Sequence, residues 1–322
     1  MAMRRRIGLV FGGCIGAAVA GQARINGELG ERLGDGVAAA VISFGTGLVV
    51  LGVAFAVSGR LRAGVGEVRR ALVSGGLRWW QLLGGLCGAF FVACQGLTVA
   101  AIGVTAFTVA VVAGQLVSSL AVDRFGIGPA GRTPVTAMRA GGAGLALAAV
   151  LLSVAGRDGG SDGALSVPES LRGGPHLLLI ALPLLAGFGV AWQQAVNGRV
   201  GAVGGPPTAT LANFLTGTAG LVLVEAVLLA GTGWPAGFPT EPWLYVGGVI
   251  GVAFIALAVL VVRWIGVLLL GLTSVAGQLL MSLVLDVAVP TGPGLSGLAV
   301  LGCVVTFAAV ALAARTRPAT DR

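Results

Sequence analysis

The sequence predicts an all-α integral membrane protein with ten transmembrane helices arranged as two inverted five-helix repeats. Three observations lead to this fold class. Of the 322 residues, 56% are hydrophobic and only 10% are charged, whereas soluble domains carry about 25% charged residues. Apolar runs of about 20 residues, the length that crosses a bilayer as a helix, recur along the whole chain. Matching motifs occur in the same order in both halves, which indicates an internal duplication.

Ten apolar stretches are expected to span the membrane. They cover residues 7–26, 37–57, 79–100, 103–122, 137–155, 177–196, 208–231, 243–262, 265–285 and 295–314. The polar segment between the fifth and sixth stretches is rich in Gly, Ser, Pro and Asp, a composition typical of a flexible linker. We therefore divide the chain into a first repeat (1–156), an external linker (157–176) and a second repeat (177–322).

The arginines predict the orientation. The net charge is +8 and the chain contains no lysine. Most arginines fall in segments on the side of the N-terminus; the exceptions are Arg24, Arg32, Arg157 and Arg172. The positive-inside rule then places both termini in the cytoplasm, which requires an even number of spans. The same rule explains the positive charge, so the charge does not indicate nucleic-acid binding.

Four motifs occur once in each half. The longest is GQLVSSLAVD at 114–123, which recurs as GQLLMSLVLD at 277–286. The other pairs are Gln-x-x-x-Asn-Gly at 22–27 and 193–198, Phe-x-Thr-Gly at 44–47 and 214–217, and a Trp followed by closely spaced Gly residues at 79–88 and 243–251. Because each half has an odd number of spans, the second half must enter the membrane from the opposite side. Inverted repeats of this kind provide a route to alternating access.

The duplicated polar side chains are the candidate substrate pathway. We expect Gln115 and Gln278 to supply hydrogen bonds near the bilayer midplane. The two entrances would be lined by Gln22, Asn26, Gln193 and Asn197. A polar side chain in hydrocarbon must be paired or face a cavity, so interhelical hydrogen bonds are the structural alternative for all six. Asn-Gly after an apolar run is also a common helix stop. Ser119 and Ser282 are expected to bond back to their own helix.

Three carboxylates are candidates for coupling or gating. Asp123 and Asp286 close the duplicated motif, and both are expected at helix ends beside water. Asp123 could instead form a solvated ion pair with the adjacent Arg124, whereas Asp286 has no neighbouring base. Glu225 lies inside a predicted span with no sequence neighbour to pair with, which marks it as a functional candidate. Arg24 can reach Glu28 one helical turn later.

These motifs, over nearly the whole chain, resemble the YdcZ-like branch of the drug/metabolite transporter (DMT) superfamily. The resemblance implies a multi-pass carrier of small molecules in the bacterial inner (plasma) membrane. Many members of that branch are single five-span halves, and this sequence resembles a fused form. Whether the fused chain acts alone or as a homodimer stays open. Small multidrug exporters of the superfamily carry a Glu in the first span, but residues 7–21 contain no carboxylate.

The predicted function is secondary transport of an unidentified small solute. No ATP-binding motif is present, so the energy would come from a gradient, with the proton as the candidate coupling ion. A lipid flippase and a non-transporting scaffold or subunit are the alternatives. A membrane-embedded enzyme is disfavoured because clustered catalytic side chains are lacking in the sequence. No cofactor or metal is expected, since the four cysteines lie in apolar stretches and the single histidine, His176, has no partner in sequence.

Overall fold

The structure is a computed structural model that describes residues 2–128, 131–132, 134–155, 177–232, 237–289 and 297–314. The predicted linker, 157–176, lies outside the described residues. Within the described ranges the chain forms helices and no strand. The helices are α1 (Ala2–Leu33), α2 (Gly36–Val57), α3 (Gly59–Val73), α4 (Gly84–Phe125), α5 (Ala137–Ala155), α6 (Leu177–Gly204), α7 (Pro206–Thr232), α8 (Gly247–Ala288) and α9 (Gly297–Ala314), with short 3₁₀ helices η1 (Trp79–Leu83) and η3 (Pro242–Tyr245) before α4 and α8.

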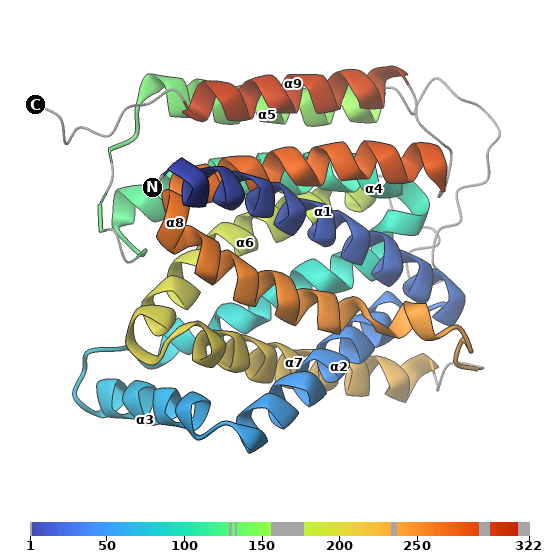
Figure 1. Cartoon of the computed structure of the whole chain (residues 1–322). Helices are drawn as coiled ribbons and strands as arrows, with labels where there is room; N and C mark the ends of the chain where they lie inside the picture. Colours follow the sequence, from blue (N-terminus) through green and yellow to red (C-terminus); the bar gives the residue numbers. More distant parts are fainter. Residues whose placement is uncertain are drawn as a thin grey trace, which may run out of the picture.

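Helices α4 and α8 are hairpins rather than single rods. Each crosses the bundle and then turns back (Figure 1). In α4 the reversal occurs at Gly103, whose φ of 75° and ψ of 161° are not helical. This backbone conformation is essentially restricted to glycine. We call Gly84–Ile102 the first arm of α4 and Val104–Phe125 its second arm.

Helices α1 and α6 are longer than the sequence predicts. Both continue through the Asn-Gly pair of the repeated motif, α1 to Leu33 and α6 to Gly204. Helix α1 therefore extends beyond residue 26, where the predicted span ends, and Asn-Gly is not a helix stop here. In α1 the glycine serves close packing, because a Cβ on Gly27 would lie 2.7 Å from the Cβ of Val99 in α4. The end of α1 comes at Gly34, with a φ of 67°.

Helix caps define where the next elements begin. The side chain of Asp35 accepts hydrogen bonds from the backbone N–H of Val37 and Ala38, at 2.8 and 3.0 Å, and so starts α2. Ser58 caps α3, which lies between the second and third predicted spans. Gly126, with a φ of 65°, ends α4.

The helices form a layered bundle (Figure 1). Helices α5 and α9 pack side by side at one edge, against the hairpins. Helix α1 packs most extensively against α8, and α6 against α4. On the other side α2 and α7 pack together through Phe44 and Phe214, whose ring centroids are 4.9 Å apart. Helix α3 lies outside this layer, beside α7.

Six helices in the described part of the chain are long and apolar enough to cross a membrane: α1, α2, α6, α7, the η1–α4 segment and the last part of α8. Shorter apolar helices occur at 137–151, 247–258 and 300–312. The protein is therefore an all-helical bundle built for a bilayer, and the count of ten spans stays a prediction.

Candidate substrate pathway

The first polar cluster lies where α1 crosses the first part of α8. Gln22 and Asn26 are only 3% and 0% exposed. The Gln22 side-chain N–H donates to the carbonyl oxygen of Gly247 at 2.8 Å, and that of Asn26 donates to Oε1 of Gln95 at 2.7 Å. We call Gln22, Asn26, Gln95 and the neighbouring Ser43 of α2 the α1 cluster.

Glycines on α8 make room for these amides. A Cβ on Gly247 would lie 2.4 Å from Oδ1 of Asn26, and one on Gly251 would lie 2.9 Å from Nε2 of Gln22. Real Cβ atoms essentially never approach so closely. The glycines that follow Trp243 are therefore explained by the side chains of the Gln-x-x-x-Asn-Gly motif that pack on them.

The second cluster repeats this arrangement with the halves exchanged. Nε2 of Gln193 and Nδ2 of Asn197, on α6, donate to Oδ1 of Asn213 on α7, at 2.8 and 2.9 Å. A Cβ on Gly84 would lie 2.6 Å from Oδ1 of Asn197, and one on Gly88 would lie 2.5 Å from Nε2 of Gln193. The motif of each half thus packs on the glycines of the other half.

Gln115 and Gln278 lie at two different helix interfaces. Nε2 of Gln115 donates to Oε1 of Gln194 on α6 at 3.2 Å. Gln278 is buried on α8, where a Cβ on Gly16 of α1 would lie 2.6 Å from its backbone nitrogen. A central site shared by the two glutamines stays a prediction.

The glycines that precede these glutamines permit close contact between helices. A Cβ on Gly114 would lie 2.0 Å from the Leu184 carbonyl oxygen, and one on Gly277 the same distance, 2.0 Å, from that of Gly13. Backbones that approach so closely require small residues in membrane helices. The two serines of the motif bond to their own helix as expected: Oγ of Ser119 donates to the Leu116 carbonyl at 2.7 Å, and Oγ of Ser282 donates to that of Leu279 at 2.8 Å.

The α1 cluster has unsatisfied hydrogen-bonding atoms. Oε1 of Gln22, Oδ1 of Asn26, Oγ of Ser43 and Nε2 of Gln95 are buried and have no partner among the described residues. An unpaired buried polar atom costs about 1–3 kcal/mol, so a cluster of them favours a polar molecule or water at this position. Sequence reasoning missed Gln95 because it lies outside the repeated motifs, although an amide within an apolar stretch is itself a signal.

The two repeated aspartates have different surroundings, and neither matches the expectation fully. Asp286 is only 7% exposed, not solvated. Its carboxylate accepts hydrogen bonds from the backbone N–H of Val104 and Thr105, at 3.0 and 2.8 Å. The reversal at Gly103 frees these N–H groups, so Asp286 caps the second arm of α4. Asp123 forms an ion pair with Arg139 of α5, not with its neighbour Arg124.

Charged groups near the predicted outer ends of the helices are partly paired. Arg24 binds Glu28 at 2.6 Å, as the one-turn spacing predicts. Glu225 on α7 is only 8% exposed, and its Oε2 has no hydrogen-bond partner in the described structure. No group of three or more potential metal ligands occurs among the described residues, and all four cysteines are free.

Long apolar helices that pack through glycines, with amides buried between them, define a polytopic helical membrane protein. The family model described as "Putative inner membrane exporter, YdcZ", of the DMT superfamily, matches residues 7–152 and 178–312. The chain belongs to this family of membrane transporters, as its repeated motifs indicate.

Two further comparisons bear on the fold. A solved structure titled "Crystal structure of protein" matches 97% of this chain and 97% of its own, with a TM-score of 0.52 and 20% sequence identity. At this identity the likeness concerns the fold alone. No curated protein matches the sequence.

Proposed function

We propose that the protein is a secondary transporter that exports a small solute across the inner membrane by alternating access between two inverted five-span repeats. The observation that carries this proposal is the reciprocal packing of the halves, in which each Gln-x-x-x-Asn-Gly motif packs on the glycines of the opposite half. With two equivalent contacts of this kind, each half could adopt the conformation of the other while the same types of helix contact are kept. Such an exchange converts an inward opening into an outward one.

The solute is a small polar or amphipathic molecule. Gln115 and Gln278 would bind it near the midplane, with Gln22, Asn26, Gln193 and Asn197 along the two half-pathways. The α1 cluster supports a polar ligand, since its unpaired atoms include both acceptors and a donor. A solute that hydrogen-bonds to them would remove the cost of their burial.

Transport is tested with purified protein in liposomes on a solid-supported membrane. We expect a saturable current for one class among small cations, anions, sugars and amino acids, or saturable counterflow of labelled solute where carriage is electroneutral. Gln115→Ala and Gln278→Ala should each weaken solute affinity or transport. Ser119→Ala, whose hydroxyl bonds to its own helix, is the matched control. Unchanged transport in both glutamine variants would contradict the central site.

Alternating access is tested with single cysteines. The four native cysteines are replaced by alanine, and Ser119→Cys or Ser282→Cys, one helical turn from Gln115 and Gln278, is introduced so that the proposed solute ligands stay in place. A membrane-impermeant thiol reagent is applied to right-side-out and inside-out vesicles. Saturating solute should change the labelling of the two positions in opposite directions. Labelling that changes in the same direction at both positions would contradict the exchange of shapes.

Glu225 is the candidate for proton coupling, with Asp286 and Asp123 as gating elements. This assignment rests on the burial of the Glu225 carboxylate, whose Oε2 has no hydrogen-bond partner in the described structure. Glu225→Gln should abolish accumulation driven by a pH gradient while preserving solute counterflow, because only the proton step is removed. Equal loss of both activities would assign Glu225 to binding or folding instead.

A further inference from the structure

A groove separates α3 from the start of α7 and the short helix η1. Its volume is about 220 Å³. The walls are apolar: Val65, Val68 and Leu72 come from α3, and Leu211 and Leu215 come from α7. At roughly 30 Å³ per water-sized group, the groove has room for part of a hydrocarbon chain.

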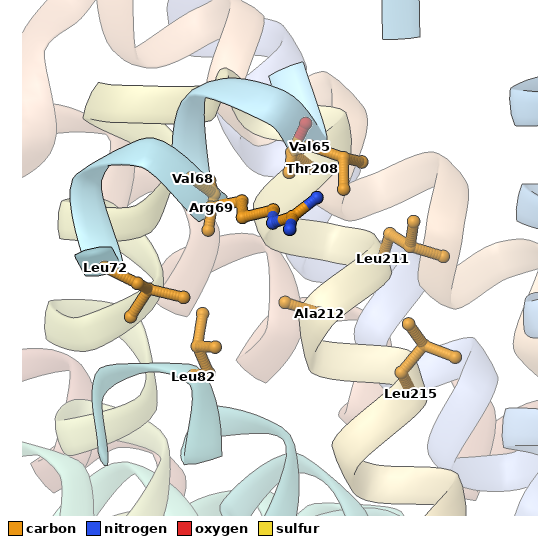
Figure 2. A pocket seen from close by; sticks show the side chains of 9 residues that line it. All are labelled: Val65, Val68, Arg69, Leu72, Leu82, Thr208, Leu211, Ala212 and Leu215. Atoms are coloured by element: carbon orange, nitrogen blue, oxygen red, sulfur yellow. The ribbon is translucent and has the colours of Figure 1, made fainter. Parts of the chain in front are cut away.

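Arg69 supplies the one charged side chain of this groove. It reaches from α3 toward α7 between the apolar walls (Figure 2). Its neighbour Arg70 pairs with Glu67, and Arg62 donates to the carbonyl oxygen of Phe55 at 2.7 Å. Within the ranges that the structure describes, Arg69 has no ion-pair partner, so its guanidinium donors are available to a ligand.

The position of the groove favours a lipid over a free solute. Residues 206–230 of α7 are among the segments able to cross a membrane, and Val65 and Leu215 on the two walls are 41% and 48% exposed. Exposed apolar side chains on the outside of such a bundle face acyl chains. Helix α3 carries four arginines and one glutamate, and its loop belongs to the side predicted to face the cytoplasm. Basic pockets of this kind on the cytoplasmic side suit anionic head groups.

We propose that this groove binds an anionic phospholipid of the cytoplasmic leaflet. One acyl chain lies between Val68 and Leu211, and the phosphate pairs with Arg69. Arginine binds phosphate through two parallel N–H donors. The inference concerns a surface outside the proposed pathway and does not depend on transport.

The test uses the whole protein in phosphatidylcholine nanodiscs with increasing phosphatidylglycerol. Native mass spectrometry counts the retained lipids, and the heating midpoint of the protein is recorded in parallel. Arg69→Gln should lower the apparent affinity for phosphatidylglycerol about tenfold, because it removes the charge-assisted N–H donors that pair with the phosphate. Ala212→Trp, which fills the groove from α7, should lower it in the same way while leaving Arg69 in place.

Arg70→Gln is the matched control. It removes the same charge one residue away, from a side chain that pairs with Glu67 and does not line the groove. Its affinity for phosphatidylglycerol should remain within about twofold of wild type. The proposal is overturned if Arg69→Gln and Arg70→Gln weaken binding equally, which would indicate general surface charge. It is also overturned if Ala212→Trp binds the lipid as wild type does, or if wild type binds phosphatidylcholine equally well.

Discussion

Asp286 holds the end of α8 to the reversal of α4, and removing its carboxylate should destabilise the bundle. The side chain accepts two backbone hydrogen bonds, at 3.0 and 2.8 Å, while 7% exposed. Hydrogen bonds to a charged group contribute about 1.5–3 kcal/mol each, and loss of a helix N-cap costs about 0.5–2 kcal/mol. Because the two bonds act together as a single helix cap, we take the upper end of the cap range and expect a loss of about 2 kcal/mol for Asp286→Ala. For the 322 residues of the chain, at about 2.1 cal/mol/K of unfolding entropy per residue, this loss corresponds to a fall of roughly 3 °C in the unfolding midpoint.

The assay is size-exclusion chromatography of the purified protein after heating, with the monodisperse fraction plotted against temperature. Asp286→Asn should lie between wild type and Asp286→Ala, since it keeps one acceptor oxygen but loses the charge. Asp123→Ala is the matched control at the equivalent position of the other repeat. Its carboxylate is 35% exposed and its ion pair with Arg139 should contribute no more than about 1 kcal/mol. An Asp286→Ala midpoint within about 1 °C of wild type, or an equal effect of Asp123→Ala, would refute the capping role.

Three further predictions concern other positions. Gly103→Ala should destabilise the protein by about 1–3 kcal/mol in the same heating assay, because an alanine must adopt a φ of 75°. Gly248→Ala should prevent recovery of monodisperse protein, since its Cβ would lie 1.8 Å from a backbone oxygen of α2, whereas Gly45→Ala, with open space, should be recovered normally. Arg32→Gln should raise the pKa of Glu241, which the hydrogen bond from Arg32 lowers. The stabilising effect of Arg32 should therefore be present at neutral pH and disappear as the pH falls through the folded-state pKa of Glu241. If the unfolding midpoints of Arg32→Gln and wild type still differ at low pH, this reasoning is contradicted.

Much of the fold could be predicted because membrane helices follow from apolar length alone. The bounds of α5, 137–155, agree with the predicted span. The predicted spans 79–100 and 103–122 correspond to η1 and the two arms of α4, although a sequence cannot reveal that the second arm starts directly after one glycine. Helix α3 was missed because its arginines mask a short apolar face formed by residues such as Val65 and Val68.

The candidate site was predictable in its members but not in its contacts. Duplication singles out Gln22, Asn26 and their counterparts, yet it does not reveal that each motif packs on the glycines of the opposite half. Long-range partners such as Gly247 carry no local signal. The prediction that Asp286 is solvated was wrong because its partners are backbone N–H groups of α4. These groups are free only because α4 reverses at Gly103, which the sequence around Asp286 does not reveal.

The exchange of contacts between the halves also constrains how the chain is made. Gln22 and its acceptor on α8 are 225 residues apart, so at about 5–20 residues per second a ribosome needs roughly 10–45 s to supply the partner. Asn26 meets Gln95, only 69 residues later, well before α8 exists. Helix α1 can therefore pair with α4 before α8 is synthesised, and its contact with α8 is the later of the two to form.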